Sequence, residues 1–402
     1  MSAGRVRFAL ARSDAGAWGS DNPEPGLLTT ATVWRSTDID ASGAWIDGSE
    51  PAERYLTPHD ARGSALSCGD VLVTKASGSP RHIGKAALVD SCREGHGFSN
   101  FMQRLTVVPG QSPAYLWHLL NSLVARAHYA QFATTTTGLK NLNGGLIGGV
   151  PLPVASGLHQ TAIANFLDRE CALIDRLVDE FARTRELTQD WLRSRIVEVL
   201  DTFNGDVPFG RYATLHRGFD LPAEDRFAGD VVVVGSGGQT GLHNVPAAPG
   251  PAVVTGRYGS IGVVTWSEAP CWPLNTTLWV SDFKQSDPRF VYWALQGLPL
   301  RQEASKAAIP GLHRADIHRL PLGSFTVTEQ RAIVKSLDAL ARETQGVRDE
   351  LEHQQSLLAE YRDALITEAV TGQLDVSSLS ESQMIESLDA VREGEPPEVL
   401  AR

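Results

Sequence analysis

One segment of the chain is written twice, 170 residues apart. "VPLPVASGLHQTAIANFLDR", which begins at Val150, aligns without a gap with "LPLGSFTVTEQRAIVKSLDA", which begins at Leu320. At this offset Gln160 meets Gln330 and Asp168 meets Asp338. The same offset continues over about 50 residues, and such a constant register indicates an internal duplication. We therefore expect two similar structural units in one chain.

Both copies of the repeated segment predict a long helix. Apolar residues recur at intervals of three, four and seven, which is the spacing of a coiled-coil seam. Each helix would contain about 40 residues and extend roughly 60 Å, and the two would most simply lie antiparallel against each other. The residues predicted for helix pairing and subunit docking are Ile163, Leu167, Ile174, Leu177, Phe181, Trp191, Ile333, Leu337, Leu340, Val347, Leu351, Leu358, Tyr361 and Leu365. The seam turns polar at Thr184 and Gln354, either to fix the register or as an interruption of the pattern.

The regions before the two helices are rich in Gly, Val and Thr and contain short strand-like runs, such as "GDVLVTKA" and "GDVVVVG". The predicted fold class is therefore α+β, with two globular α/β domains separated by two long antiparallel coiled-coil helices. The domains would span 1–150 and 201–320, and the helical spacers 151–200 and 321–375. We expect the acidic tail, 376–402, to be disordered.

Composition limits the class of protein. The four cysteines are scattered without a CxxC pair, which argues against a disulfide framework or a zinc site and favours the cytoplasm. No apolar run is long enough for a membrane span. The net charge of −11 resides in the helical segments and the tail, because 1–150 carries +1 and 201–320 carries −1. The acidic total therefore does not exclude basic patches on the two globular domains.

Two glycine-rich stretches resemble nucleotide-binding loops but do not fit them. In "GSPRHIGKA" five residues separate Gly78 from Gly84 where a phosphate loop requires four, and Ala86 stands where Ser or Thr would hold magnesium. In "VVVVGSGGQTG" Thr240 replaces the third glycine of a dinucleotide site. No catalytic constellation is recognisable, so the sequence predicts a protein that is not an enzyme. An unfamiliar active site in "GSPRHIGK" is the alternative, which turnover by the isolated chain would favour.

Polar loops supply the remaining chemistry. Arg, Lys, Asn, Ser and Thr side chains hold phosphates and read the edges of bases. The predicted DNA-binding residues of the first domain are Lys75, Ser77, Ser79, Arg81, Lys85, Arg104, Thr136, Lys140, Asn141 and Asn143. Those of the second domain are Arg257, Tyr258, Ser260, Asn275, Thr276, Thr277 and Arg314. No residues are predicted to be catalytic or to bind a metal.

Several of these segments resemble the specificity (S) subunit of type I restriction–modification systems. "LPLGSFTVTEQRAIVKSLDA" and "YRDALITEAVTGQLDV" are similar to the second conserved helical region of that family, and "VPLPVASGLHQTAIANFLDRECALIDRLVDE" to the first. "GDVLVTKASGS", "GFSNFMQRL" and "GPAVVTGRYGSIGVVTWSEAPCWPLNTTLWV" resemble its target recognition domains. The chain departs from the family at His159, where an acidic residue usually precedes the glutamine.

The resemblance implies a function. Each recognition domain would read one half of a split, asymmetric site in double-stranded DNA, and the paired helices would set the spacing between the half-sites. The helices would also dock methyltransferase (M) subunits, two per S subunit, which carry S-adenosylmethionine, and through them the restriction (R) subunits. The chain itself would hold no cofactor. The alternative is a coiled-coil scaffold of a related defence complex whose globular ends bind protein, which salt-sensitive DNA binding would distinguish.

Overall fold

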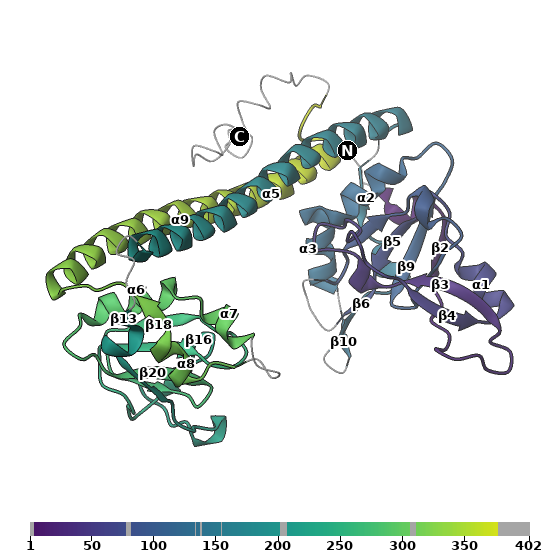
Figure 1. Cartoon of the computed structure of the whole chain (residues 1–402). Helices are drawn as coiled ribbons and strands as arrows, with labels where there is room; N and C mark the ends of the chain where they lie inside the picture. Colours follow the sequence, from purple (N-terminus) through teal and green to yellow (C-terminus); the bar gives the residue numbers. More distant parts are fainter. Residues whose placement is uncertain are drawn as a thin grey trace. The chain divides into compact units, whose positions relative to one another are not determined.

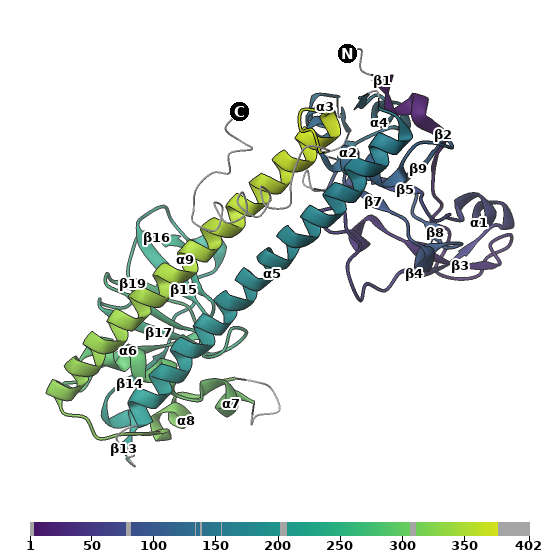
Figure 2. The same cartoon turned by 90° about the horizontal axis from the view of Figure 1, so that it is seen from above.

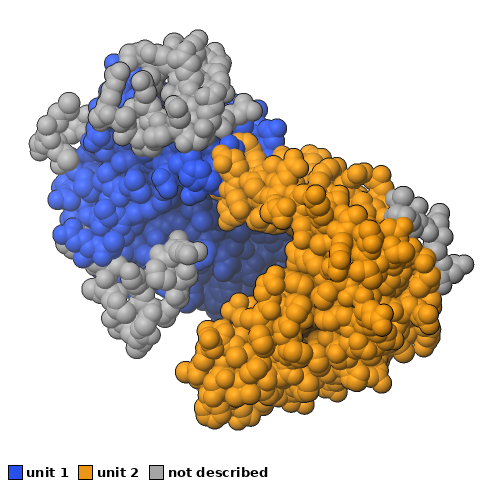
Figure 3. Space-filling model, turned by 90° about the vertical axis from the view of Figure 1, so that its left-hand side faces the viewer, with its two compact units in different colours: residues 1–180, 353–402 blue, residues 181–352 orange. Residues whose placement is uncertain are grey.

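The structure is a computed structural model that describes residues 4–77, 82–132, 134–136, 139–153, 155–201, 207–305 and 311–376. Contacts divide the chain into two compact units, one of residues 1–180 and 353–402 and the other of residues 181–352 (Figure 3). Each unit contains one module of mixed helix and sheet together with parts of two long helices, so the predicted α+β class is confirmed. This division passes through both long helices, whereas the domains expected from the sequence separate helices from modules.

The module of the first unit is built on a four-stranded antiparallel sheet of order β2-β9-β5-β7. Its strands are β2 (Leu10–Ala15), β9 (Met102–Val107), β5 (Val71–Thr74) and β7 (Ala86–Leu88). A three-stranded sheet lies next to it, with β3 (Thr29–Trp34) between antiparallel β4 (Ala52–Leu56) and parallel β8 (Gly97–Phe98). The short helices are α1 (Pro58–Ser64), α2 (Pro113–Asn121), α3 (Leu123–Phe132) and α4 (Gly144–Ile147).

The second unit repeats the topology of these two sheets. Its four-stranded antiparallel sheet has the order β14-β20-β17-β18, formed by β14 (Thr214–Arg217), β20 (Thr277–Asp282), β17 (Ala252–Gly256) and β18 (Val264–Ser267). Its β15 (Val231–Gly235) again lies between an antiparallel strand, β16 (Gly238–His243), and a parallel one, β19 (Cys271–Pro273). The helices α6 (Pro288–Gly297), α7 (Leu300–Ala304) and α8 (Arg314–Arg319) follow. The duplication therefore includes the globular modules, as the sequence predicted.

The long helices are α5 (Gly157–Asp201) and α9 (Val327–Thr371), each of 45 residues. A two-residue strand precedes each helix and pairs with the first strand of its own module. The pairs are β12 (Pro151–Leu152) with β1 (Gly4–Arg5), and β21 (Pro321–Leu322) with β13 (Val207–Pro208). At the start of α9, Thr326 and Glu329 form a reciprocal capping box, because the Thr326 N–H donates to Glu329 Oε2 at 2.7 Å and the Glu329 N–H to Thr326 Oγ1 at 3.3 Å.

In each unit a part of α5 lies beside a part of α9 (Figures 1 and 2). Within the first unit, Asp175 pairs with Arg362 at 3.2 Å, and the Val178 carbonyl accepts from Gln355 Nε2 at 2.9 Å. The residue number rises along one helix while it falls along the other, so the two helices run antiparallel, as predicted. Most predicted seam residues lie inward, either buried or half-buried: Ile163, Leu167, Ile174, Leu177, Phe181, Ile333, Leu337, Leu340, Leu351, Leu358, Tyr361 and Leu365.

Two of the predicted residues do not pair the helices, although the prediction of subunit docking at these positions stays open. Trp191 is 49% exposed and Val347 is 46% exposed. A straight helix of 3.6 residues per turn drifts away from a strict seven-residue repeat, and in α5 Ile196 turns towards the core of the second module instead. In α9 the buried side chain nearest to Val347 is that of Thr344, one turn earlier, whose hydroxyl donates to the Leu340 carbonyl at 2.8 Å.

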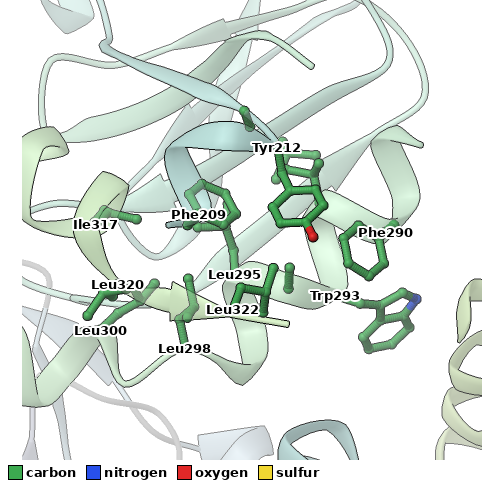
Figure 4. Close-up of a cluster of buried hydrophobic side chains, with 14 of the residues drawn as sticks. Phe209, Tyr212, Phe290, Trp293, Leu295, Leu298, Leu300, Ile317, Leu320 and Leu322 are labelled. Atoms are coloured by element: carbon green, nitrogen blue, oxygen red, sulfur yellow. The ribbon is translucent and has the colours of Figure 1, made fainter. Parts of the chain in front are cut away.

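The core of the second module continues into the helices. Phe290, Trp293 and Leu295 of α6 pack with Phe209 and the other aromatic and aliphatic side chains of this cluster (Figure 4). The same cluster includes Ile196 and Leu200 of α5 and Ile333 and Leu337 of α9. Burying a large apolar side chain contributes about 1.5–3 kcal/mol, so this shared core fixes the module to its part of the helix pair.

Equivalent polar contacts join each module to the helices. Gln160 Oε1 accepts from the N–H of Ser112, the N-cap residue of α2, at 3.0 Å. Gln330 Oε1 accepts from the N–H of Asp287, the N-cap residue of α6, at 2.9 Å. Asp168 lies 2.7 Å from His118 Nε2, and Asp338 accepts from Trp293 Nε1 at 2.8 Å. The glutamine and the aspartate of each repeat therefore make equivalent contacts in both units, and these contacts dock α2 or α6 onto the long helix. Among the described residues, none of the helices combines the length and apolar character that crossing a membrane requires.

Candidate nucleic-acid interface

A basic residue follows the same strand in each module. Lys75 comes directly after β5 and Arg257 directly after β17. The Lys75 N–H donates to the Phe101 carbonyl at 2.8 Å, and the Arg257 N–H donates to the Thr276 carbonyl at 2.9 Å. The next amide in each module reaches the same carbonyl at 3.4 Å. The two basic residues therefore occupy equivalent positions in the two modules.

The carbonyls of these two residues are equivalent as well. The Lys75 carbonyl accepts from the Leu142 N–H at 2.8 Å, and the Arg257 carbonyl accepts from the Leu312 N–H at 3.0 Å. Each module thus ties three segments together by backbone hydrogen bonds: the end of the central strand, the turn before the neighbouring strand, and the segment that contains Leu142 or Leu312. We call this arrangement the loop junction of each module. Rigid backbone pairing of this kind holds the exposed side chains of loops in fixed positions.

Each loop junction contains a four-residue turn with an asparagine at its second position. In the turn 99–102 the last N–H donates to the first carbonyl at 3.0 Å, and in the turn 274–277 the same bond measures 2.9 Å. Asn100 is exposed, and Asn275 is half-buried with its Nδ2 donating to Asp220. A four-residue turn closed by this hydrogen bond presents its two central side chains outward.

The structure brings together several predicted residues of the first module. The pairing of β6 (Ala76–Ser77) with β11 (Leu139–Asn141) places Ser77 opposite Lys140, next to the half-buried Lys75. Burial lowers the pKa of Lys75. Asn143 is exposed and caps α4, because its Oδ1 accepts from the Leu146 N–H at 2.9 Å. The remaining predictions are placed less fully: of Thr136 in β10 (Thr134–Thr136) and Lys140 only the backbone is described, and Ser79 and Arg81 lie outside the described residues.

In the second module the Arg257 guanidinium lies 4.6 Å above the ring of Tyr258, which is 39% exposed. Arg257 Nε donates to the Leu312 carbonyl at 3.2 Å. Thr276 is half-buried beside these residues, and Ser260 is exposed in the loop that follows Tyr258. Arg314, the first residue of α8, is exposed two residues beyond the loop junction. The predicted residues of this module therefore gather around one junction.

Three predicted DNA-binding residues are buried and serve the fold instead. Arg104 is 1% exposed, and its guanidinium binds both carboxylate oxygens of Asp14 at 2.9 and 2.7 Å. Lys85 is 5% exposed, with its ammonium directed at the Ile39 carbonyl. Thr277 is fully buried, and its hydroxyl donates to the carbonyl that closes its own turn at 2.7 Å. These three predictions are wrong, because the positions of polar residues in the sequence do not show which side chains the packing of the module buries.

Two residues of the first junction were missed from the sequence. Asn100 and Phe101 occupy the positions that Asn275 and Thr276 occupy in the second module, and Phe101 is 52% exposed. The sequence contains a signal for these two residues, because "SNFM" and "LNTT" each place an asparagine two residues before a strand, β9 or β20. Only the shared hydrogen bonds reveal that the two are equivalent. In the described part of the chain, no three His, Cys, Asp or Glu side chains are grouped so as to hold a metal ion.

Comparison with solved structures identifies the architecture. One chain from a study of the complex assembly and conformational transition of a type I R-M system superposes with a TM-score of 0.70 at 17% identity, covering 92% of this chain and 98% of the other. The HsdS subunit from Thermoanaerobacter tengcongensis superposes with a TM-score of 0.50 at 18% identity, covering 92% of this chain and 97% of that subunit. Neither a protein-family model nor a curated protein sequence matches the chain.

The chain therefore has the fold of a type I restriction–modification specificity subunit: two modules of mixed helix and sheet and two long helices. At identities of 17% and 18%, the likeness defines the fold. The function is argued from the loop junctions and the helices.

Proposed function

We propose that the chain is the DNA-specificity subunit of a type I restriction–modification complex. The observation that carries the proposal is the pair of loop junctions, which hold a basic residue and an asparagine by the same backbone hydrogen bonds but carry different neighbouring side chains. Two different reading surfaces on one repeated scaffold suit a site made of two unlike halves. In this proposal each module reads one half-site, and the paired helices set the spacing between them.

The DNA-reading role predicts a separable effect of the two junctions. Lys75→Ala should relax recognition of one half-site and Arg257→Ala recognition of the other, each by roughly 1–3 kcal/mol if a base contact is lost. Arg211→Ala is the matched control, since Arg211 is exposed in the same unit as Arg257 but outside its junction. The measurement is the methylated sequence motif in cells that carry each variant with its methyltransferase partner. Equal relaxation of both half-sites by one variant would instead indicate a phosphate contact or a folding defect.

The proposed partners are methyltransferase subunits that dock on the helices. Leu187 and Trp191 are 59% and 49% exposed one turn apart on α5, and Val347 of α9 is 46% exposed. Exposed leucine and tryptophan side chains on one helix face are typical of protein interfaces. Trp191→Ala should reduce retention of the methyltransferase subunit on the tagged chain, whereas Leu158→Ala, at an 88% exposed position in the first turn of α5, should not. Unchanged retention would remove Trp191 from the docking surface.

In this proposal the methyl donor, S-adenosylmethionine, is bound by the methyltransferase subunit. Because the two modules carry net charges of only +1 and −1 over 1–150 and 201–320, their nonspecific attraction to phosphates should be modest, and the chain alone should bind DNA weakly. Mapping methylated sites in the host genome with and without this gene tests the whole proposal. The motif should disappear with the gene, and its persistence would refute the assignment.

A further inference from the structure

The turn of the first loop junction combines features that suit the reading of a thymine. Phe101 is 52% exposed, which is unusual for a phenylalanine in a turn pinned by backbone hydrogen bonds. Its carbonyl accepts from Lys75 N at 2.8 Å, and its own N–H donates to Ser99 Oγ at 3.2 Å. Ser99 is 2% exposed. The ring is therefore held outside the core by a backbone that has little freedom to withdraw it.

The chemistry around Phe101 is that of a polar surface. Asn100 precedes it and is exposed, and Lys75 lies against its carbonyl. The equivalent residue of the second junction is Thr276, whose side chain carries a methyl group beside Asn275. In both modules the residue immediately after the asparagine carries an apolar group, the exposed ring of Phe101 or the methyl group of the half-buried Thr276. In the major groove, thymine is the base that offers a methyl group, and Phe side chains and Thr methyl groups are among its known contacts.

We infer that Phe101 is a specificity-determining residue that contacts the 5-methyl group of a thymine in the half-site read by the first module. This inference rests on the proposed function and adds the identity of one base. Of the possible partners of the exposed ring, a base methyl group is favoured because Phe101 follows an asparagine in its turn and its carbonyl accepts a hydrogen bond from the backbone of a lysine. A protein partner would not require that pairing of groups to recur in the second module.

The test uses the full chain assembled with its methyltransferase subunits and a DNA duplex that carries the mapped motif. Each thymine of the first module's half-site is replaced in turn by deoxyuridine, which lacks only the 5-methyl group. For the wild-type complex, one replacement should weaken binding about fourfold, the change expected for one buried methyl group. For Phe101→Ala the same replacement should have no effect, while Phe101→Leu should retain part of it.

The control is Phe8→Ala, because Phe8 is 77% exposed in the same unit but lies in η1 (Val6–Ala9), away from the junction. This variant should respond to deoxyuridine as the wild type does. The inference is overturned if no single replacement affects the wild type, or if Phe101→Ala remains as sensitive as the wild type. In both cases sequence-dependent binding would persist and the proposed function would stand. Absence of sequence-dependent binding by the wild-type complex would instead refute the proposed function and the inference together.

Discussion

Replacing Arg104 by methionine should destabilise the first module without acting on a DNA contact. Methionine keeps much of the unbranched stem but removes the guanidinium. In the native structure this group makes two bonds to Asp14, at 2.9 and 2.7 Å. It also donates to the carbonyls of Ala65 at 2.6 Å and Gly63 at 2.7 Å. The substitution therefore removes the buried donor of Asp14 and of two carbonyl oxygens, and only the exposed Arg12 still donates to Asp14 and to the Gly63 carbonyl.

The size of the effect follows from burial. Removing one partner of a buried ion pair costs about 3–5 kcal/mol, because the remaining charge is left uncompensated. The Asp14 side chain is 33% exposed and can recover some hydration, so we expect the lower end, about 3 kcal/mol. For a module of this size such a loss corresponds to a fall in Tm of roughly 6–12 °C.

The assay is thermal unfolding, with hydrogen exchange of β2 and β9 to localise the loss. Arg12→Met is a matched control, because Arg12 also binds Asp14 at 2.7 Å and the Gly63 carbonyl at 2.8 Å but is 46% exposed. An exposed pair of this kind contributes about 0–1 kcal/mol. If Arg104→Met unfolded like the wild type but lost recognition of one half-site, the structural role argued for Arg104 would be refuted.

Gln330→Leu should loosen the docking of α6, because it removes the acceptor of a backbone N–H at 2.9 Å, and faster hydrogen exchange at the start of α6 would report about 1 kcal/mol of lost stability. His318 Nε2 accepts from the Leu215 N–H at 2.9 Å, and burial followed by nearby positive charges lowers the pKa of His318. A depressed histidine pKa contributes stability above about pH 6.5 that is lost as the pH falls through the folded-state pKa. Urea unfolding should therefore show an acid-sensitive second module that His318→Gln makes less pH-dependent and His313→Gln leaves unchanged. Burial raises the pKa of Cys271 to about 11, so at pH 8 an alkylating reagent should label the two exposed cysteines of the native protein and reach Cys271 only after unfolding.

The loop junctions were the part of the candidate site that sequence reasoning predicted least well. Lys75 and Arg257 were both selected from the sequence, but as members of two unrelated polar loops. Arg104, which was predicted and is buried, and Asn100, which was not predicted and is exposed, show why the other site predictions were incomplete. Within a strand, alternate residues face opposite sides, and only the packing of the module decides which side is buried. In a turn, exposure depends on which residues the backbone hydrogen bonds hold outward, and composition does not encode this directly.

The long helices were predicted more completely. Gln160 and Gln330 marked the repeat, and their equivalent hydrogen bonds to the start of α2 and α6 show that the repeated letters serve the same contact. Trp191 and Val347 lie outside the seam because a strict seven-residue repeat does not continue along the whole of these helices. The true course of the seam depends on the packing of α5 and α9 against the modules, as the inclusion of Ile196 in the core of the second module illustrates.

The sequence by itself determined the duplication, the α+β class and the two helices, because helical periodicity and a constant offset are local properties of the chain. The tertiary structure decided which residues of the two modules correspond, since Lys75 and Arg257 become equivalent only through bonds to Phe101 and Thr276, which lie 26 and 19 residues further along. It also decided which polar side chains remain outside. Both decisions depend on contacts between segments distant in sequence, and the free energy of those contacts comes from burial and hydrogen bonding that no local pattern records.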